Sequence, residues 1–146
     1  MAVTVSGLYV ANFIDILDAT QLAVDLSLTT NKIAMYTNSV TPNFSTDVGY
    51  NSTNEVSGTG YTAGGAAVAS PTITESPTGS LMYDRADTAW STSTITNARC
   101  SILYADALAG DNKICLVNFG ADYSTVAGTF TIQWAATGMF AIDLTP

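Results

Sequence analysis

The chain contains no histidine and very little charge. Its 146 residues include four Lys and Arg and twelve Asp and Glu, so charged residues make up 11% and the formal net charge is −8. Globular domains average about 25% charged residues. Without imidazole, neither a Ser-His-Asp nor a Cys-His catalytic arrangement can be built, and the commonest protein metal ligand is missing. We therefore expect no enzyme activity, no cofactor and no metal.

Basic side chains and long apolar runs are also missing. Four basic residues are too few for nucleic-acid binding, which depends on Lys and Arg displacing counterions from phosphates. No apolar run approaches the ~20 residues that cross a bilayer, and the N-terminus lacks the basic region of a secretory signal. We expect neither a nucleic-acid nor a membrane partner.

Hydroxyl groups supply the polarity that charges do not. Ser and Thr together number 35, while apolar residues make up 47% of the chain and the mean hydropathy is +0.26. A weakly charged surface of this kind suggests that further copies of the chain or another protein cover part of it.

Strand patterns dominate from residue 64 onward. Segments 114–119, 130–134 and 140–144 are apolar throughout or alternate in polarity, and turn residues separate them. Such short strands predict a single-domain β-sandwich or jelly-roll-like barrel over residues 31–146. The core is expected to contain Ile114, Leu116, Val117, Phe119, Phe130, Ile132, Trp134, Phe140, Ile142 and Leu144.

The first thirty residues differ from the rest. Segment 8–17 carries apolar residues at spacings that predict a short helix, and residues 46–55 could add one helical turn. Residues 1–30 are therefore interpreted as an N-terminal arm or short helix, which could reach a neighbouring subunit. Segment 66–74 predicts one strand, in which Pro71 marks a bulge or an edge position.

The glycine-rich stretch EVSGTGYTAGG, residues 55–65, matches no phosphate-binding loop. It lacks the Gly-Lys-Ser/Thr end of a Walker loop, and a predicted strand follows it where a dinucleotide site needs a helix. A structural loop with positive φ angles and close backbone approaches is the better interpretation. In it, Tyr61 would pin the loop to the core and Glu55 would accept backbone N–H groups. The loop residues concerned are Glu55, Gly58, Gly60, Tyr61, Gly64 and Gly65.

Two cysteines flank a predicted hairpin turn. With the turn centred between residues 107 and 108, Cys100 lies opposite Cys115, so a cross-strand disulfide is geometrically possible. The alternative is two buried thiols that act as small hydrophobic groups.

Carboxylates are the remaining candidates for chemistry. Asp84 and Asp87 could form the acid pair of a glycosidase, but a local ion pair with Arg85 is the simpler explanation. The segment 106–112 could hold a loose Ca²⁺ site, and a solvated turn is the alternative.

Three segments together carry a resemblance to known proteins. They are EVSGTGYTAGG, then YDRADTAWSTSTITNARCSILYAD, then ICLVNFGADYSTVAGTFTIQWAATGMFAIDL, and they occur in this order over most of residues 31–144. In these segments the chain resembles a family of small structural proteins of tailed-bacteriophage virions, described as head-decoration or minor tail proteins. Cys100 departs from the family pattern, which has an ordinary apolar residue there.

The resemblance implies a place in the virion rather than an enzymatic role. The first expectation is a capsid decoration, or cement, protein that binds the outer face of the phage head as a homotrimer and contacts the major capsid protein. The alternatives are a neck, collar or tail component, or a carbohydrate-binding module on the virion surface that stacks sugars on Tyr61, Tyr83 and Trp90.

Overall fold

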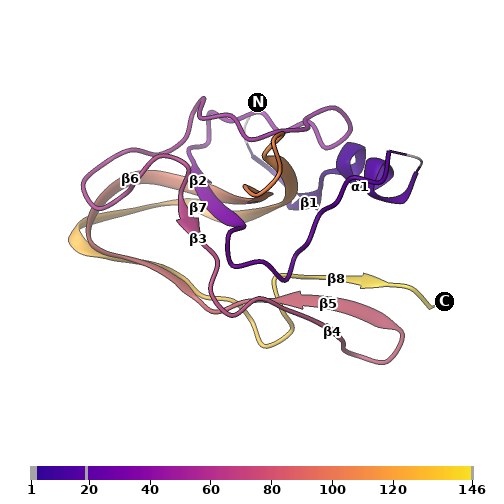
Figure 1. The fold of residues 1–146 in the computed structure, drawn as a ribbon. Helices are drawn as coiled ribbons and strands as arrows, with labels where there is room; N and C mark the ends of the chain where they lie inside the picture. Colours follow the sequence, from indigo (N-terminus) through magenta and orange to yellow (C-terminus); the bar gives the residue numbers. More distant parts are fainter. Residues whose placement is uncertain (1–2, 19, 146) are drawn as a thin grey trace.

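Two antiparallel sheets and one short helix make up the structure, a computed structural model that describes residues 3–18 and 20–145 (Figure 1). The first sheet has the strand order β1-β7-β6-β2-β3, and the second has the order β4-β5-β8. The elements are β1 (Gly7–Leu8), α1 (Val10–Leu17), β2 (Lys32–Tyr36), β3 (Ala66–Ala67), β4 (Thr72–Glu75), β5 (Ser80–Asp84), β6 (Thr88–Ala105), β7 (Asn112–Ile132) and β8 (Phe140–Asp143). The fold is mainly β and sandwich-like, as the sequence predicted.

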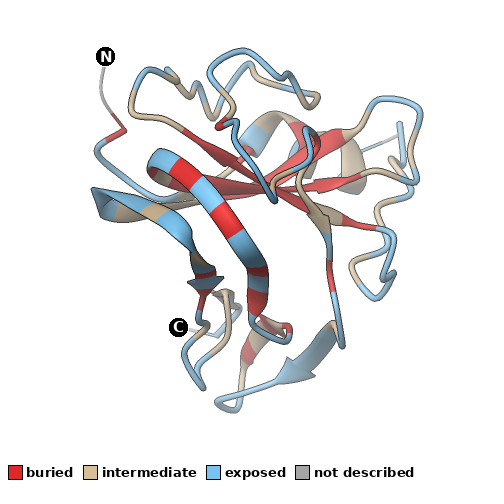
Figure 2. Cartoon of the chain, turned by 90° about the vertical axis from the view of Figure 1, so that its left-hand side faces the viewer, coloured by how far each residue is buried: buried red, intermediate tan, exposed pale blue. Residues whose placement is uncertain are grey.

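A long hairpin of β6 and β7 forms the centre of the molecule. Next to its turn, residues 100–105 and 112–116 are buried on both faces, which explains their near-continuous apolar sequence. Further from the turn the hairpin curls away from the first sheet, and β6 alternates between buried and exposed residues (Figure 2). The hairpin therefore belongs to the first sheet at one end and approaches the second sheet at the other (Figure 1).

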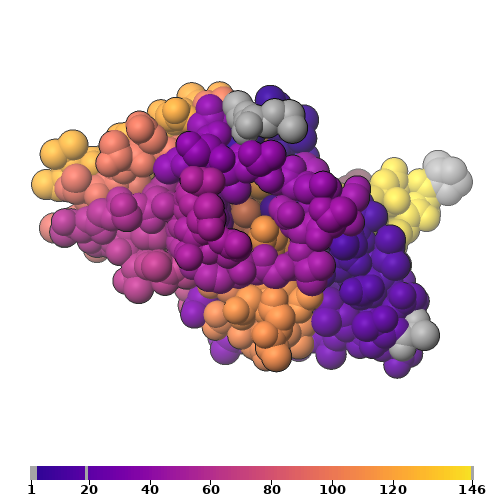
Figure 3. All heavy atoms as spheres, turned by 90° about the horizontal axis from the view of Figure 1, so that it is seen from above, coloured from indigo at the N-terminus to yellow at the C-terminus, as the bar shows by residue number. Residues whose placement is uncertain are grey.

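Three hydrophobic clusters fill the molecule. One lies between the two sheets, where Tyr83 and Phe140 meet Leu103 and Cys115. Another fills the inside of the curled hairpin. The last lies on the opposite face of the first sheet, around Tyr36, and is covered by the loop between β2 and β3, which spreads over the top of the molecule (Figure 3).

The predicted core is largely correct. Ile114, Leu116, Phe130 and Ile132 are buried. Val117, Phe119, Trp134 and Phe140 are half-buried and pack against the clusters, and Ile142 is half-buried as well. The prediction was wrong for Leu144, whose side chain is 70% exposed. Leu144 lies just after β8. Phe140, Ile142 and Leu144 alternate with polar or small residues, but only the Phe140 end of this series reaches the cluster between the sheets.

The single strand predicted over residues 66–74 is two strands in different sheets. β3 belongs to the first sheet and β4 to the second, and the chain crosses between them through Ser70, whose φ is +48°. The edge position inferred from Pro71 is correct, because β4 is an outer strand.

The predicted N-terminal helix is present as α1, but residues 3–18 do not form a separate arm. Val3 and Tyr9 are fully buried in the cluster around Tyr36, and β1 pairs with β7. These contacts place the segment inside the same domain as the strands.

Candidate interaction surfaces

The glycine-rich loop packs its backbone directly against two strands. A Cβ added to Gly58 would lie 1.9 Å from the carbonyl oxygen of Thr94 in β6, and one added to Gly65 would lie 1.9 Å from that of Ile33 in β2. Both glycines have positive φ angles, +146° and +76°. The predicted positive φ angles and close approaches are therefore confirmed.

The Glu55 carboxylate holds this loop in place through three hydrogen bonds. It accepts hydrogen bonds from the Tyr50 hydroxyl at 2.6 Å, the Tyr61 hydroxyl at 2.7 Å and the Gly64 N–H at 2.8 Å. The Tyr61 hydroxyl also accepts the N–H of Met35 at 2.9 Å, which ties the loop to β2. Burial, together with the hydrogen bond to Glu55, raises the pKa of Tyr61 well above its usual value. These hydrogen bonds connect the loop to Tyr50 and to β2 and so support its conformation.

The two cysteines lie on opposite faces of the first sheet. Cys100 pairs with Asn118 and belongs to the cluster around Tyr36, whereas Cys115 pairs with Leu103 and lies between the sheets. The assumed register was wrong by three residues, and an odd shift moves a side chain to the other face. Both thiols are free and buried, and burial raises the pKa of each to about 12.

The two carboxylates of the segment DRAD, residues 84–87, accept backbone N–H groups and form no ion pair with Arg85. The Asp84 carboxylate accepts the backbone N–H of Arg85, and that of Asp87 accepts the backbone N–H of Trp134 at 2.9 Å. The Arg85 guanidinium is buried, donates to the Thr88 hydroxyl and stacks 5.4 Å from the centre of the Trp134 ring. Burial lowers the pKa of Arg85 to about 10. The expected local ion pair of Arg85 is wrong, because the side chain turns inward while the carboxylates cap backbone groups.

The hairpin turn carries one ion pair. Asp106 lies 3.0 Å from the Lys32 ammonium group, and both side chains are about one-third exposed. Across residues 3–18 and 20–145, no three His, Cys, Asp or Glu side chains converge as a metal site would require. In the same described ranges, no helix is long and apolar enough to cross a membrane.

Of the three aromatic residues proposed as sugar platforms, two are buried and one is half-buried. Tyr83 is fully buried, Trp90 is 6% exposed, and Tyr61 is tied to Glu55 and β2. Tyr83 and Trp90 therefore offer no ring face to a sugar, whereas Tyr61 is half-buried and packs against the cluster inside the curled hairpin.

Exposed apolar residues gather at the far end of the second sheet. Ile73 pairs with Tyr83, which pairs with Phe140, so these side chains share the face that packs between the sheets. Two residues along, Leu81 and Ile142 continue this face, and Leu144 follows. Ile73 is 43% exposed and Leu144 is 70% exposed. We call Ile73, Leu81, Ile142 and Leu144 the apolar ladder.

The apolar ladder is an extension of the core that the chain does not cover. Ile73, Leu81 and Leu144 line a hollow of about 410 Å³ together with Thr74, Glu75, Gly79, Ser80 and Thr145. Seen from above, the C-terminal end projects past the rest of the molecule (Figure 3). Apart from Ile142 and Leu144, sequence reasoning missed these residues, although the alternation in TITE and SLMYD indicates one apolar face.

A smaller apolar stripe lies on α1. Val10, Ile14 and Leu17 recur at helical spacing on its outer face and are 50%, 56% and 84% exposed. The opposite face is anchored by Asn12, which is completely buried.

No protein-family model matches the chain, and no match was found among curated proteins or solved structures.

Proposed function

We propose that the protein is a non-enzymatic structural component of a tailed-bacteriophage particle and decorates the outer face of the head as a cement protein. The observation that carries this proposal is the apolar ladder, an uncovered continuation of the core at the end of the second sheet. Exposed apolar surface that is continuous with a core is typical of sites that a protein partner covers. The motif order over residues 31–144 and the net charge of −8 support the outer face, because packaged DNA repels an acidic protein.

In this role the protein acts by mass action. A protein that binds only the assembled shell shifts the equilibrium toward assembly and raises the melting temperature of the shell. A homotrimer on threefold lattice points would present three ladders at once, and symmetric binding of this kind multiplies the effective affinity.

The copy number of the chain per purified particle tests where in the particle the protein is located. We expect quantitative mass spectrometry to give a simple ratio to the major capsid protein, such as one trimer per lattice point. A small ring-like number would instead indicate a neck, collar or tail component. Absence of the chain from the particle would contradict any virion role.

A pair of variants tests the surface. Changing Ile73 and Leu144 together to Ser should weaken binding to shells assembled without this protein by at least about tenfold, because burying each such side chain is worth ~1.5–3 kcal/mol. Val126→Ser is the matched control, since Val126 is 85% exposed and lies outside the ladder. Binding is measured by co-sedimentation and by the melting temperature of the shell. Equal binding by both variants would remove the ladder from the proposal.

A further inference from the structure

The outer edge of β4 borders the apolar ladder, and we propose that it binds a β-strand of the partner protein with a basic residue opposite Glu75. The inference deepens the proposed function and rests on it, because the strand belongs to the protein that covers the ladder. It depends on the open backbone of β4, on the position of Glu75 and on the pairing of the basic side chains.

β4 is a regular strand at the edge of the second sheet. All four of its residues are exposed (Figure 2). It pairs with β5 without a register shift over its whole length. Edge strands are commonly protected from further pairing by a bulge, a proline or a lysine. β4 contains none of these, since its sequence is Thr-Ile-Thr-Glu, so the edge can accept an added strand.

The backbone groups that face this edge belong to Ile73 and Glu75. Next to them, the N–H of Ser76 donates to the carbonyl oxygen of Ser80 at 3.0 Å, in register with the pairs of β4 and β5. Hydrogen-bonded pairs alternate along an antiparallel ladder, so the N–H and C=O groups of Ile73 and Glu75 point away from β5. The side chains of the same two residues lie on the face of the apolar ladder. An added strand would therefore place side chains on that face directly beside them.

The other edge of the second sheet, β8, is arranged differently. The N–H of Leu144 donates to the carbonyl oxygen of Gly79, in register with the pairs of β5 and β8. By the same alternation, the outward backbone groups of β8 belong to Ala141 and Asp143. Their side chains lie on the face opposite the ladder, because Ile142 between them lies on the ladder face.

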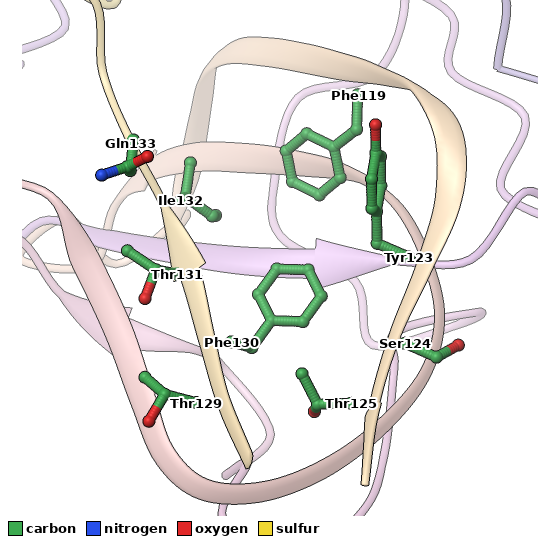
Figure 4. Close-up of a pocket in the computed structure, with 9 residues that line it drawn as sticks. All are labelled: Phe119, Tyr123, Ser124, Thr125, Thr129, Phe130, Thr131, Ile132 and Gln133. Carbon is green, nitrogen blue, oxygen red and sulfur yellow. The ribbon is translucent and has the colours of Figure 1, made fainter.

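The outer edge of β7 is long but irregular. Within the described residues β1 pairs with only two residues of β7, so no strand lies beside this edge from residue 119 onward. There β7 turns at Gly120, whose φ is +81°, and its pairing with β6 shifts register repeatedly. The limbs 119–125 and 129–133 stand on two sides of a hollow of about 380 Å³ beside Tyr123 (Figure 4). A bent edge of this kind resists strand addition, whereas β4 does not.

Glu75 determines the charge of the added strand. Its Oε1 atom accepts the N–H of Gly79 at 2.8 Å, and no described residue bonds to its Oε2 atom. Glu75 also lines the hollow of about 410 Å³ together with Ile73 and Leu81. A residue opposite Glu75 on an added strand would have its Cβ atom roughly 5 Å away on the same face, where opposite charges attract.

The basic side chains of the chain are already engaged in internal contacts. Three of them form ion pairs, which are Lys32–Asp106, Arg99–Asp122 and Lys113–Asp47. The fourth, Arg85, is buried against Trp134. Within residues 3–18 and 20–145, no unpaired basic side chain is left to meet Glu75 of another copy, and two copies with a net charge of −8 each repel one another. Charge complementarity therefore favours a different protein over a second copy.

The register predicts a short pattern in the partner. An antiparallel strand, like the others in this sheet, meets Glu75 before it meets Ile73, and the two positions are two residues apart. The expected pattern is therefore Lys or Arg, any residue, then an apolar residue. The apolar side chain would extend the row of Ile73, Tyr83 and Phe140 by one strand.

The test uses the complete isotopically labelled chain and the capped peptide Thr-Val-Thr-Lys-Thr-Val-Thr-Val, with binding followed through backbone amide NMR shifts. We expect the amide signals of Ile73 and Glu75 to shift most, because their N–H groups face the edge. A second peptide, with Glu in place of Lys, should bind about tenfold more weakly, since attraction opposite Glu75 becomes repulsion.

Two variants of Glu75 separate charge from backbone. Glu75→Gln removes the charge but keeps the outward N–H, so it should remove most of the preference for the Lys peptide. Glu75→Pro also removes that N–H and should weaken the Lys peptide by about a further fivefold. Proline is tolerated where the missing N–H faces solvent on an edge strand.

Asp143→Asn is the matched control. It changes the net charge as Glu75→Gln does, but its side chain lies on the opposite face of the same sheet. It should bind both peptides as the unchanged protein does. Thermal unfolding of each variant establishes that the fold is intact.

Three results would overturn the inference. They are no binding of the Lys peptide at millimolar concentration, equal binding of the Lys and Glu peptides, and equal effects of Asp143→Asn and Glu75→Gln. Sedimentation tests the alternative occupant, because an oligomer of the chain that Glu75→Pro dissociates would make this edge a contact between copies and also contradict the inference.

The copy number per particle separates this inference from the proposed function. A chain that is absent from particles but binds the Lys peptide would contradict the virion role and leave the strand-binding edge in place. A chain that is present at a simple ratio but binds no peptide would contradict the strand-binding edge alone.

Discussion

At the scale of single residues, Gly65 in the glycine-rich loop and Gly120 in β7 show two separate reasons for a glycine. Gly65 has a positive φ and also lies against the backbone of Ile33. Gly120 has a similar φ of +81°, but no atom lies within 4 Å of the position that a Cβ would take. The chain thus offers a comparison between conformational strain alone and strain combined with a collision.

We expect Gly65→Ala to lower the free energy of unfolding by at least about 3 kcal/mol, because the new methyl group must displace β2 as well as adopt a strained conformation. Gly120→Ala should lower it by only about 1 kcal/mol, the cost of a left-handed conformation for a non-glycine residue. Urea unfolding followed by tryptophan fluorescence measures both. Equal losses for the two variants would contradict a close backbone approach at Gly65.

Arg85 shows how a residue pattern can suggest the wrong partner. Two carboxylates flank it in the sequence, yet its guanidinium stacks on Trp134, which lies far away along the chain. Trp134 carries an apolar ring into the same region, and an arginine side chain combines an apolar stem with a planar cation that suits an aromatic face. Proximity in sequence did not determine the contact, because Arg85 points into the protein.

At the scale of elements, α1 is held by a buried amide in addition to the apolar packing of Phe13. The Asn12 Nδ2 group donates to the carbonyl oxygens of Val48 at 2.7 Å and Lys113 at 2.6 Å, and its Oδ1 accepts from Asn112 at 3.1 Å. The side chain is completely buried. It therefore joins the helix, the loop before β3 and the start of β7.

We expect Asn12→Ala to lower the free energy of unfolding by about 3 kcal/mol, because it leaves buried carbonyl and amide groups without partners. Ile14→Ala on the same helix is the control. Its side chain is 56% exposed, so shortening it should lower the free energy of unfolding by well under 1 kcal/mol. Urea unfolding of the two variants compares them directly. Similar losses would show that Asn12 contributes no more than an exposed residue of the helix.

The long hairpin shows what the sequence can and cannot specify about an element. Its two strands were predicted, and so was the inward direction of Phe130 and Ile132. The register was not, because the turn covers residues 106–111 and β7 has one extra residue, Ile114, between the pairs Tyr104–Lys113 and Leu103–Cys115. Neither feature leaves a periodic signal, so the disulfide geometry assumed for Cys100 and Cys115 failed with the register.

At the scale of the whole molecule, buried weak acids make the fold sensitive to alkali. Burial raises the pKa of Cys100 and Cys115 from 9.0 to about 12, and that of Tyr83 from 10.0 to about 12. Five further tyrosines have a raised pKa, chiefly because of burial. Each of these groups holds its proton more tightly in the folded protein than in the unfolded chain.

We expect the free energy of unfolding to stay level up to about pH 9 and to fall as the pH rises toward 12, because the unfolded state loses these protons first. Arg85 acts in the opposite direction above about pH 10, since burial lowers its pKa, but it is one group against eight. Urea unfolding across this range, with phenolate absorbance recorded in parallel, measures the effect. A level or rising stability in this range would contradict the burial of these groups.

The local sequence pattern was sufficient to predict the fold class, the short helix, the positive φ angles of the glycine-rich loop and most of the core residues. These features depend on neighbours along the sequence: alternation orients side chains on a strand, and only glycine tolerates a close backbone approach at positive φ. The roles of Glu55 and Tyr61 followed from the same local reasoning, and the structure confirms both.

Packing between distant segments decided the remaining features. It divided residues 66–74 between two sheets, placed the cysteines on opposite faces, left Leu144 exposed and created the hollow beside Tyr123. An apolar strand face has the same sequence whether a sheet covers it or solvent does. Only the arrangement of the second sheet and the curl of β7 determine which apolar faces are buried in the core and which remain open to a partner.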